Sequence, residues 1–381
     1  MSEAVIVSAL RTPVGTAVKG TLRETSAYDL AEHVVAAAAK GLDPASIDDV
    51  VLAEEHYGGG VVARHAALTA GFGSVPGLAL NRHCAGGLSA VAAAAASIRA
   101  GMDELVIAGG VHSSSTAPRS RFPGAAGEWI DPWTPPTHPN RPDAPNLDMS
   151  ITIGWNTAVQ ASVTREEMDA WALRSHQNAI RAIDEGRFAA ELVPIDTPFG
   201  RFAVDEHPRR TTSLEKLAAL KPLHPEIEGF SITAGNACGS NDAAAALVVA
   251  SDQCDLPALA TVRSWASVGV DPAATGLAPV LVIPKALARC GLTVADVGVF
   301  EINEAFASVA VAAIRRLDLD PDLVNVNGSG CSLGHPIAAT GARMLVTLVH
   351  ELRRRGGGIG VAAMCAGGGM GSAMVIEVPA P

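Results

Sequence analysis

Residues 78–110 read LALNRHCAGGLSAVAAAAASIRAGMDELVIAGG, and this stretch decides the fold. A short apolar run leads into a turn, a helix of small residues is predicted over 88–100, and a strand is predicted over 105–108. A turn that joins a strand to a helix, followed by a return to a strand, is typical of α/β proteins. The stretch therefore predicts an α/β fold.

Cys84 lies in that turn, just before the predicted helix. Free N–H groups and the helix dipole favour negative charge there, so we expect the pKa of the Cys84 thiol to be lowered and its thiolate to be nucleophilic. Gly86 and Gly87 leave space for a substrate to approach the sulfur. The competing interpretation is a buried cysteine that packs like a small hydrophobe.

The composition favours a large core built from small side chains. The 381 residues are 48% hydrophobic and 18% charged, and only 4% are aromatic. A net charge of −11, with no basic run longer than the arginines at 353–355, argues against a nucleic-acid partner. A local basic site for a phosphorylated ligand is compatible with this composition.

The six cysteines form neither a C-x-x-C pair nor a zinc-binding spacing, so we expect reduced thiols and no metal site. The N-terminal residues run directly into a predicted strand, without the pattern of a signal peptide. Apolar runs fall well short of the roughly 20 residues that cross a bilayer. We therefore expect a cytoplasmic protein without a membrane span.

Helix caps and prolines outline the rest of the chain. Ser26 caps a helix predicted over 26–40, and Thr164 begins a capping box for a long amphipathic helix over 164–185. Between residues 116 and 146, eight prolines rule out a continuous helix or central strand. That segment is predicted to run over the surface.

An internal repeat relates the two ends of the chain. The segment GLDPASIDDV at 41–50 resembles GLTVADVGV at 291–299, and Cys84 and His335 follow these segments at spacings that differ by one residue. We therefore predict a duplicated α/β unit, with Pro-rich and charged material inserted into the first copy. In such a pseudo-symmetric pair, the turns of Cys84 and His335 can face each other.

His335 ends a glycine-rich loop. The loop follows a predicted strand that begins at Asn325 and precedes a helix from Ile337, with Pro336 in its first turn. An imidazole at this place can take the proton of a thiol and so activate it as a nucleophile. The competing interpretation is a loop histidine hydrogen-bonded to the backbone.

Cys365 lies between a strand predicted over 359–364 and a glycine-rich turn that contains Gly367. Backbone N–H groups in such a turn can point at an oxyanion. Two thiols, Cys84 and Cys365, permit one nucleophile and one acid or base. A disulfide between them is the competing interpretation, and it would require an oxidising compartment.

Asn303 and Glu304 follow a strand predicted over 297–300. The amide of Asn303 could hold a water or a carbonyl oxygen, and Glu304 could orient a neighbouring histidine. The alternative is that Asn303 is a helix cap. Neither residue alone identifies a reaction.

Four motifs in this order resemble the thiolase family of acetyl-CoA acetyltransferases and 3-ketoacyl-CoA thiolases. The resemblance covers nearly the whole chain. The motifs are NRHCAGG at 81–87, NEAF at 303–306, GHP at 334–336 and CAG at 365–367. The loop-domain and coenzyme-A segments of the family are resembled by DEHPR at 205–209 and TAGNA at 233–237.

The resemblance implies a duplicated five-layer αβαβα fold with an inserted loop domain. The expected division is an N-terminal region at 1–262, with its core at 1–116 and 242–262 and the loop domain at 117–241, followed by a C-terminal domain at 263–381. The family also implies a homodimer or homotetramer, with acyl-CoA and coenzyme A as substrates. It implies neither a permanently bound cofactor nor a metal.

The resemblance also implies a role for each catalytic residue. Cys84 would take the acyl group as a thioester while His335 accepts its proton, and Cys365 would move the α-carbon proton. His335 with a water on Asn303 would form one oxyanion hole, and the N–H groups of Cys84 and Gly367 would form the other. The expected reactions are 3-ketoacyl-CoA thiolysis and the reverse Claisen condensation, with ping-pong kinetics.

Contacts with coenzyme A are expected, again by resemblance, from Arg209, Thr211, Lys216, Ala234 and Cys238. For the charged members, a solvated surface is the alternative. Cys238 stands where the family usually has serine. Ala338 replaces a usual glycine and adds a methyl group near His335.

Two further segments depart from the family pattern. EEHY at 54–57 lies where glycine and glutamine are usual, and HSSS at 112–115 replaces a usual Glu-Ser-Met-Ser. These departures leave the acyl chain of the substrate unassigned, and short, medium-length, branched and cyclic chains are all compatible with the sequence. The alternative functions are a catalytically weak thiolase-like subunit that binds CoA, and a specialised condensing enzyme, although the related condensing families lack the second cysteine, Cys365.

Overall fold

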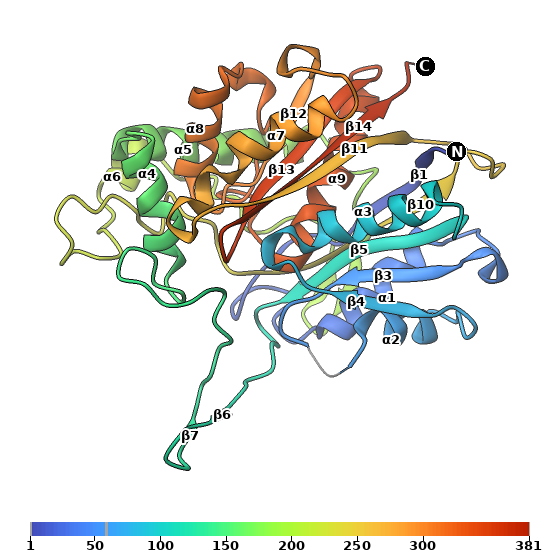
Figure 1. The fold of residues 1–381 in the computed structure, drawn as a ribbon, viewed down its shortest axis with the longest axis horizontal. Coiled ribbons are helices and arrows are strands. Elements are labelled where there is room, and N and C mark those ends of the chain that lie inside the picture. Colours follow the sequence, from blue (N-terminus) through green and yellow to red (C-terminus); the bar gives the residue numbers. More distant parts are fainter. Residues whose placement is uncertain (1, 58–59, 381) are drawn as a thin grey trace.

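The computed structural model describes residues 2–57 and 60–380. Within them the main sheet has ten strands in the order β12-β13-β14-β11-β1-β10-β5-β3-β4, with β2 paired to β10 (Figure 1). The strands are β1 Ala4–Arg11, β2 Gly15–Thr16, β3 Asp49–Ala53, β4 Gly77–Leu80, β5 Leu105–Ser113, β10 Asn241–Ser251, β11 Ala260–Gly269, β12 Val299–Ile302, β13 Gly358–Ala366 and β14 Met370–Val378. The helices that cover it are α1 Ala27–Ala38, α2 Val62–Thr69, α3 Gly86–Arg99, α7 Ala278–Ala288, α8 Ala307–Leu317 and α9 Ile337–Arg354.

The sheet consists of two halves with the same topology. In the first half β3 is parallel to β5, and β5, β10 and β1 follow as antiparallel neighbours. In the second half β12 is parallel to β13, and β13, β14 and β11 follow in the same way. The halves meet where β1 pairs antiparallel with β11, with Val5 opposite Thr261. This arrangement confirms the duplication expected from the repeat.

The helices and the two halves of the sheet form five layers, and three buried hydrophobic clusters lie between them. Helices α1 and α2 pack on the outer face of the first half, α7 and α8 on the outer face of the second, and α3 and α9 lie between the two halves. Along β10, Ala246 and Val248 belong to the outer cluster, whereas Leu247 and Val249 belong to the central one. A strand buried on both faces reads as a continuous apolar run, as this one does. The expected αβαβα order is therefore confirmed.

Close contact of α3 with α9 depends on glycine. A Cβ on Gly87 would lie 2.5 Å from the backbone nitrogen of Ala342, and one on Gly341 would lie 2.5 Å from that of Leu88. Neither position can take a side chain without moving a helix backbone. This contact brings the N-terminal ends of α3 and α9, and hence the turns before them, close together.

Both predicted capping boxes are present, at Ser26 and at Thr164. The strand predicted to begin at Asn325 is wrong, because only a single bridge forms there, between Phe300 and Val324. Asn325 adopts a left-handed backbone (φ 51°), and its side chain bonds the N–H and the C=O of Ile302. The side chain thus occupies the positions that a neighbouring strand would use.

The segment between β5 and β10 contains the proline-rich excursion. Its regular elements are β6 Phe122–Pro123, β7 Trp129–Ile130, α4 Asn156–Gln160, α5 Arg165–Asp184, β8 Ile195–Thr197, β9 Gly200–Phe202 and α6 Leu214–Ala218. The β6–β7 hairpin extends away from the body of the molecule (Figure 1). A buried guanidinium joins this segment to the sheet, because Arg11 on β1 bonds Glu191 at 2.6 Å and Asp205 at 2.8 and 2.9 Å. None of the helices in the described residues has the length and apolar character needed to cross a membrane.

Candidate active site

Cys84 lies in a single 3-10 turn, His83–Ala85, that leads into α3. The turn is sharp because His83 has a left-handed backbone (φ 46°), and the Asn81 side chain accepts the His83 N–H at 2.7 Å. The side chain of Cys84 is half-buried and packs against the central cluster. The predicted turn before the helix is therefore present.

The expected lowering of the Cys84 pKa is wrong. Burial raises the pKa of this thiol well above its ordinary value, and the negative charge of Glu55 and the neighbouring Cys365 raise it further. A hydrogen bond from the Gly367 N–H to the sulfur acts in the opposite direction but is outweighed. Loss of water around the sulfur exceeds the effect of the helix N-terminus, so Cys84 rests as a thiol and needs a base.

His335 has the properties of that base. Its backbone N–H bonds Asn241 at 2.9 Å, and its Nδ1 lies 2.7 Å from the hydroxyl of Thr340. The same hydroxyl donates to the carbonyl of Pro336 at 2.9 Å, so it accepts from Nδ1 and leaves the lone pair on Nε2. Burial lowers the pKa of His335 to about 3, which keeps the ring neutral.

Cys365 and Gly367 lie at the end of β13. Cys365 is fully buried, and burial raises the pKa of its thiol to about 12. A Cβ on Gly367 would lie 3.3 Å from Thr137, and the Gly367 N–H is a hydrogen-bond donor to Cys84. All six cysteines are free thiols in the structure.

Asn303 is buried and contacts the proposed base, with Nδ2 3.4 Å from Nε2 of His335. Its Oδ1 has no hydrogen-bond partner within the described residues. Asn303 is not a helix cap, because α8 begins at Ala307 after Phe306. The role suggested for Glu304 is wrong: no histidine contacts it in the described part of the chain, and its hydrogen bonds come from Trp171, Ser175, Asn325 and Cys331.

The residues expected to bind coenzyme A separate into three places. Arg209 and Ala234 line a recess of about 40 Å³. Thr211 and Lys216 are exposed and contact each other, with the ammonium 2.6 Å from the Thr211 carbonyl oxygen. Cys238 lies near Cys365 and Cys84, and burial raises the pKa of its thiol to about 12.

Sequence reasoning did not identify Glu55, His83 and His112 as neighbours of Cys84 and His335. Nδ1 of His83 lies 2.9 Å from Glu55, and both Glu55 and His112 influence the charge state of His335. These residues follow, or end, the neighbouring parallel strands β3, β4 and β5, whose carboxyl ends meet at one edge of the sheet. The sequence feature that could have pointed to Glu55 and His112 is the departure of segments 54–57 and 112–115 from the family pattern.

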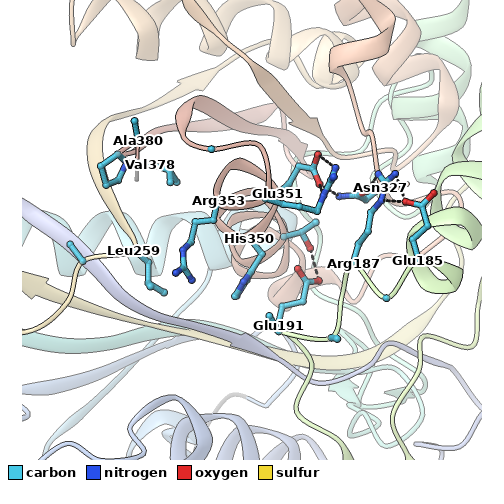
Figure 2. Close-up of a pocket in the computed structure, with 18 residues that line it drawn as sticks. Glu185, Arg187, Glu191, Leu259, Asn327, His350, Glu351, Arg353, Val378 and Ala380 are labelled. Carbon is cyan, nitrogen blue, oxygen red and sulfur yellow. Dashed lines mark hydrogen bonds and ion pairs between the residues drawn. The ribbon is translucent and has the colours of Figure 1, made fainter.

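The size of a cavity does not identify the site in this molecule. A recess of about 760 Å³ lies around His350 and Arg353, near the C-terminal end of α9, and Figure 2 shows the residues that line it. At 1.5 Å per residue, His350 is about 20 Å along the helix from His335. None of the predicted site residues in the described part of the chain lines this recess. Residues 2–57 and 60–380 also contain no group of three His, Cys, Asp or Glu side chains placed to hold a metal ion.

Comparison with known families decides the membership of the chain. The family model for the thiolase N-terminal domain matches residues 4–253, and the model for the thiolase C-terminal domain matches residues 256–378. The chain belongs to the thiolase family. This thiolase is 39% identical to a 3-ketoacyl-CoA thiolase of Bacillus subtilis, over 99% of this chain and 100% of that protein. It is also 39% identical to an acetyl-CoA acetyltransferase of Escherichia coli, over 99% of both chains.

Solved structures resemble this thiolase over its whole length. The human mitochondrial 3-ketoacyl-CoA thiolase in complex with CoA superposes with a TM-score of 0.91 at 34% identity, covering 99% of this chain and 98% of that one. The Bacillus anthracis acetyl-CoA acetyltransferase has a TM-score of 0.89 at 38% identity, covering 99% of both. The fold and the family are therefore established together.

Proposed function

We propose that this thiolase transfers acyl groups between acyl-CoA and coenzyme A through a thioester on Cys84. The observation that carries the proposal is that the turn of Cys84, whose sulfur the Gly367 N–H reaches, packs against α9, the helix that the neutral imidazole of His335 directly precedes. Relatives named acetyl-CoA acetyltransferase and 3-ketoacyl-CoA thiolase support the same reaction class. The reaction is 3-ketoacyl-CoA thiolysis or the reverse Claisen condensation.

In thiolysis, Nε2 of His335 takes the thiol proton as the sulfur of Cys84 attacks the C3 carbonyl carbon of the substrate. The C2–C3 bond then breaks, and Cys365 donates its proton to C2 of the departing acetyl-CoA. Coenzyme A finally attacks the thioester carbon while the Cys365 thiolate takes the proton of its thiol, and the Cys84 sulfur leaves and recovers its proton from His335. A thiol with a pKa of about 12 suits Cys365 as the acid, because it stays protonated until a strongly basic enolate forms.

Two sets of donors would stabilise the oxyanions. We assign the N–H groups of Cys84 and Gly367 to the tetrahedral intermediate on the sulfur. His335 and a water held by Asn303 would stabilise the enolate. The Oδ1 of Asn303, buried and unbonded among the described residues, supports this second assignment because it can accept from such a water.

The remaining expectations also belong to this proposal. Coenzyme-A contacts are proposed at Arg209, Ala234, Cys238, Thr211 and Lys216, and the recess that Arg209 and Ala234 line supports the first two. The division at 262/263, the homodimer or homotetramer and the cytoplasmic location rest on the resemblance and on the free thiols.

The test is thiolysis of acetoacetyl-CoA and of a longer 3-ketoacyl-CoA by the wild type and by Cys84→Ala. We expect wild-type turnover with ping-pong kinetics, a labelled acyl group trapped on Cys84, and loss of both in the variant. A variant as active as the wild type would reject the mechanism. A folded wild type without turnover and without acyl label would favour a CoA-binding subunit instead.

A further inference from the structure

Glu55 and three histidines form a cluster beside Cys84. Nδ1 of His83 lies 2.9 Å from Oε1 of Glu55, and Nε2 of His56 lies 3.8 Å from Oε2. The rings of His56 and His112 are 5.7 Å apart. We call Glu55, His56, His83 and His112 the imidazole cluster. Its members come from segments far apart in the sequence, so the cluster exists only in the folded chain.

Two polar atoms in this cluster are buried and unbonded among the described residues, Oε2 of Glu55 and Nδ1 of His112. The Glu55 side chain is only 13% exposed. A buried carboxylate whose Oε2 accepts no hydrogen bond from the described residues exerts its charge on its neighbours, among them Nε2 of His56 at 3.8 Å.

Glu55 is ionised at neutral pH. Burial alone would raise the pKa of its carboxyl, but the hydrogen bond from His83 and the nearby imidazoles outweigh burial and hold that pKa below its ordinary value. The resulting negative charge lies near Cys84 and disfavours its thiolate. A nucleophilic cysteine beside an uncompensated carboxylate would be difficult to ionise.

His83 is placed to compensate for this charge. It directly precedes Cys84, it contacts Glu55, and a Cβ on Gly367 would lie 3.9 Å from its ring carbon Cδ2. The imidazole therefore lies between Glu55 and the turn of Gly367, the glycine whose N–H reaches the Cys84 sulfur. Its proton would form an ion pair with Glu55 without a net charge near Cys84.

We propose that Glu55 and His83 are positioning residues that act as one charge-neutral pair, in which protonated His83, oriented by Glu55, cancels the carboxylate charge and permits Cys84 to form its thiolate. When Cys84 ionises, its S–H proton passes to Nε2 of His335 and no other bond changes. The inference rests on the proposed role of Cys84 as nucleophile. Other titratable groups facing the pair or the sulfur are His56, His112, Cys238, His335 and Cys365.

The test measures the pH dependence of Cys84 alkylation by iodoacetamide in the whole protein, with the modified residue located by mass spectrometry. His83→Asn leaves the Glu55 charge uncompensated, and asparagine tolerates the left-handed backbone. We expect about tenfold slower alkylation at pH 7 and a midpoint about one pH unit higher. Adding Glu55→Gln to this variant removes the charge as well and should restore the rate to within about threefold of the wild type.

A double variant that stays as slow as His83→Asn would overturn the proposal, as would a His83→Asn variant with the wild-type profile. Glu55→Gln alone keeps the backbone turn and gives an independent result if His83→Asn does not fold. Its midpoint should equal or lie below that of the wild type, and a higher midpoint would also overturn the proposal. His65→Asn, an exposed substitution on α2, is the control.

The alkylation readout separates this proposal from the proposed function. Rescue by the double variant, combined with full turnover by Cys84→Ala, would reject Cys84 as the nucleophile and retain the charge pair. Turnover that depends on Cys84, combined with unchanged alkylation profiles, would reject the charge pair and retain Cys84 as the nucleophile.

Discussion

Glu55 and Glu304 lie just past equivalent strands, β3 in the first half of the sheet and β12 in the second, and their surroundings are opposite. Glu304 is fully buried, and both of its carboxylate oxygens are bonded. Its donors are the side chains of Trp171, Ser175 and Asn325 and the N–H of Cys331. Glu55 is hydrogen-bonded to one histidine, and its second oxygen accepts no hydrogen bond from the described residues, with Nε2 of His56 3.8 Å away.

The difference shows how a duplicated fold can use one position in two ways. Because Glu304 accepts hydrogen bonds from a complete set of donors, it helps to hold the loop that contains Cys331. These hydrogen bonds also stabilise the negative charge of the Glu304 carboxylate. An incompletely bonded carboxylate such as Glu55 acts instead on the groups around it. The first half thus places a carboxylate near the proposed nucleophile, Cys84, and the second half uses its carboxylate to hold the loop that contains Cys331.

The largest effect should come from removing the proposed base, His335, which lies in the second half. In His335→Asn we expect kcat to fall about 10²- to 10⁴-fold, because the Cys84 proton loses its acceptor. His350→Asn places the same change near the far end of α9, the helix that His335 precedes, about 20 Å away, and should leave kcat unchanged. Steady-state thiolysis measures both. A His335→Asn variant within tenfold of the wild type would place the base elsewhere.

A second variant tests how closely the first half of the sheet packs against a helix of the second half. A Cβ on Gly110 of β5 would lie 2.2 Å from the carbonyl oxygen of Ala338 in the first turn of α9. We expect Gly110→Ala to lower the free energy of unfolding by about 3 kcal/mol, because a helix backbone must move. Gly73→Ala, where no atom lies within 4 Å, is the matched control. Denaturant unfolding that gave equal values for the two variants would contradict the close packing of α9 on β5.

The third variant tests the two glutamates directly. Glu304→Gln replaces an acceptor-only carboxylate among four donors with an amide that must turn an N–H toward one of them. We expect a loss of about 2 kcal/mol in unfolding free energy, against less than about 1 kcal/mol for Glu55→Gln. Thermal unfolding of both variants at pH 7.5 measures this. The comparison fails if Glu55→Gln is the more damaging change.

The smallest expected effect is a loss of folding stability at acidic pH. Burial lowers the pKa of His112 to about 4 from an ordinary 6.5, so below pH 6.5 the unfolded chain binds a proton that the folded chain does not. Stability is therefore highest above pH 6.5 and falls by about 1.4 kcal/mol per pH unit for this residue down to about pH 4.

His112→Asn removes that proton and provides the measurement. Between pH 6.5 and 5.5, its unfolding free energy should fall less than that of the wild type, by about 1 kcal/mol. His335, His176 and His207 also have lowered pKa values and remain in both proteins, so the difference isolates His112. Parallel pH curves for variant and wild type would show that His112 is protonated in the folded protein.

The confirmed predictions depend on local patterns. The capping boxes at Ser26 and Thr164, the turn before Cys84 and the spacing of the repeat each need only a few consecutive residues, or two copies of them. The strand start predicted at Asn325 is wrong because the left-handed backbone there depends on the groups of Ile302 that the Asn325 side chain bonds. The pKa of Cys84 was misjudged because the dipole of a helix is local, whereas the loss of water is not.

The sequence by itself determined the α/β class, the duplication, the family and the order of the residues around the reaction, because these follow from periodicity, turn chemistry and motifs along the chain. Only the tertiary structure decided that Glu304 supports a loop rather than a histidine, that Cys84 rests as a thiol, and that Glu55 meets His83. Strand order places these groups together, and burial sets their charges. Both are properties of the packed molecule that no short stretch of sequence contains.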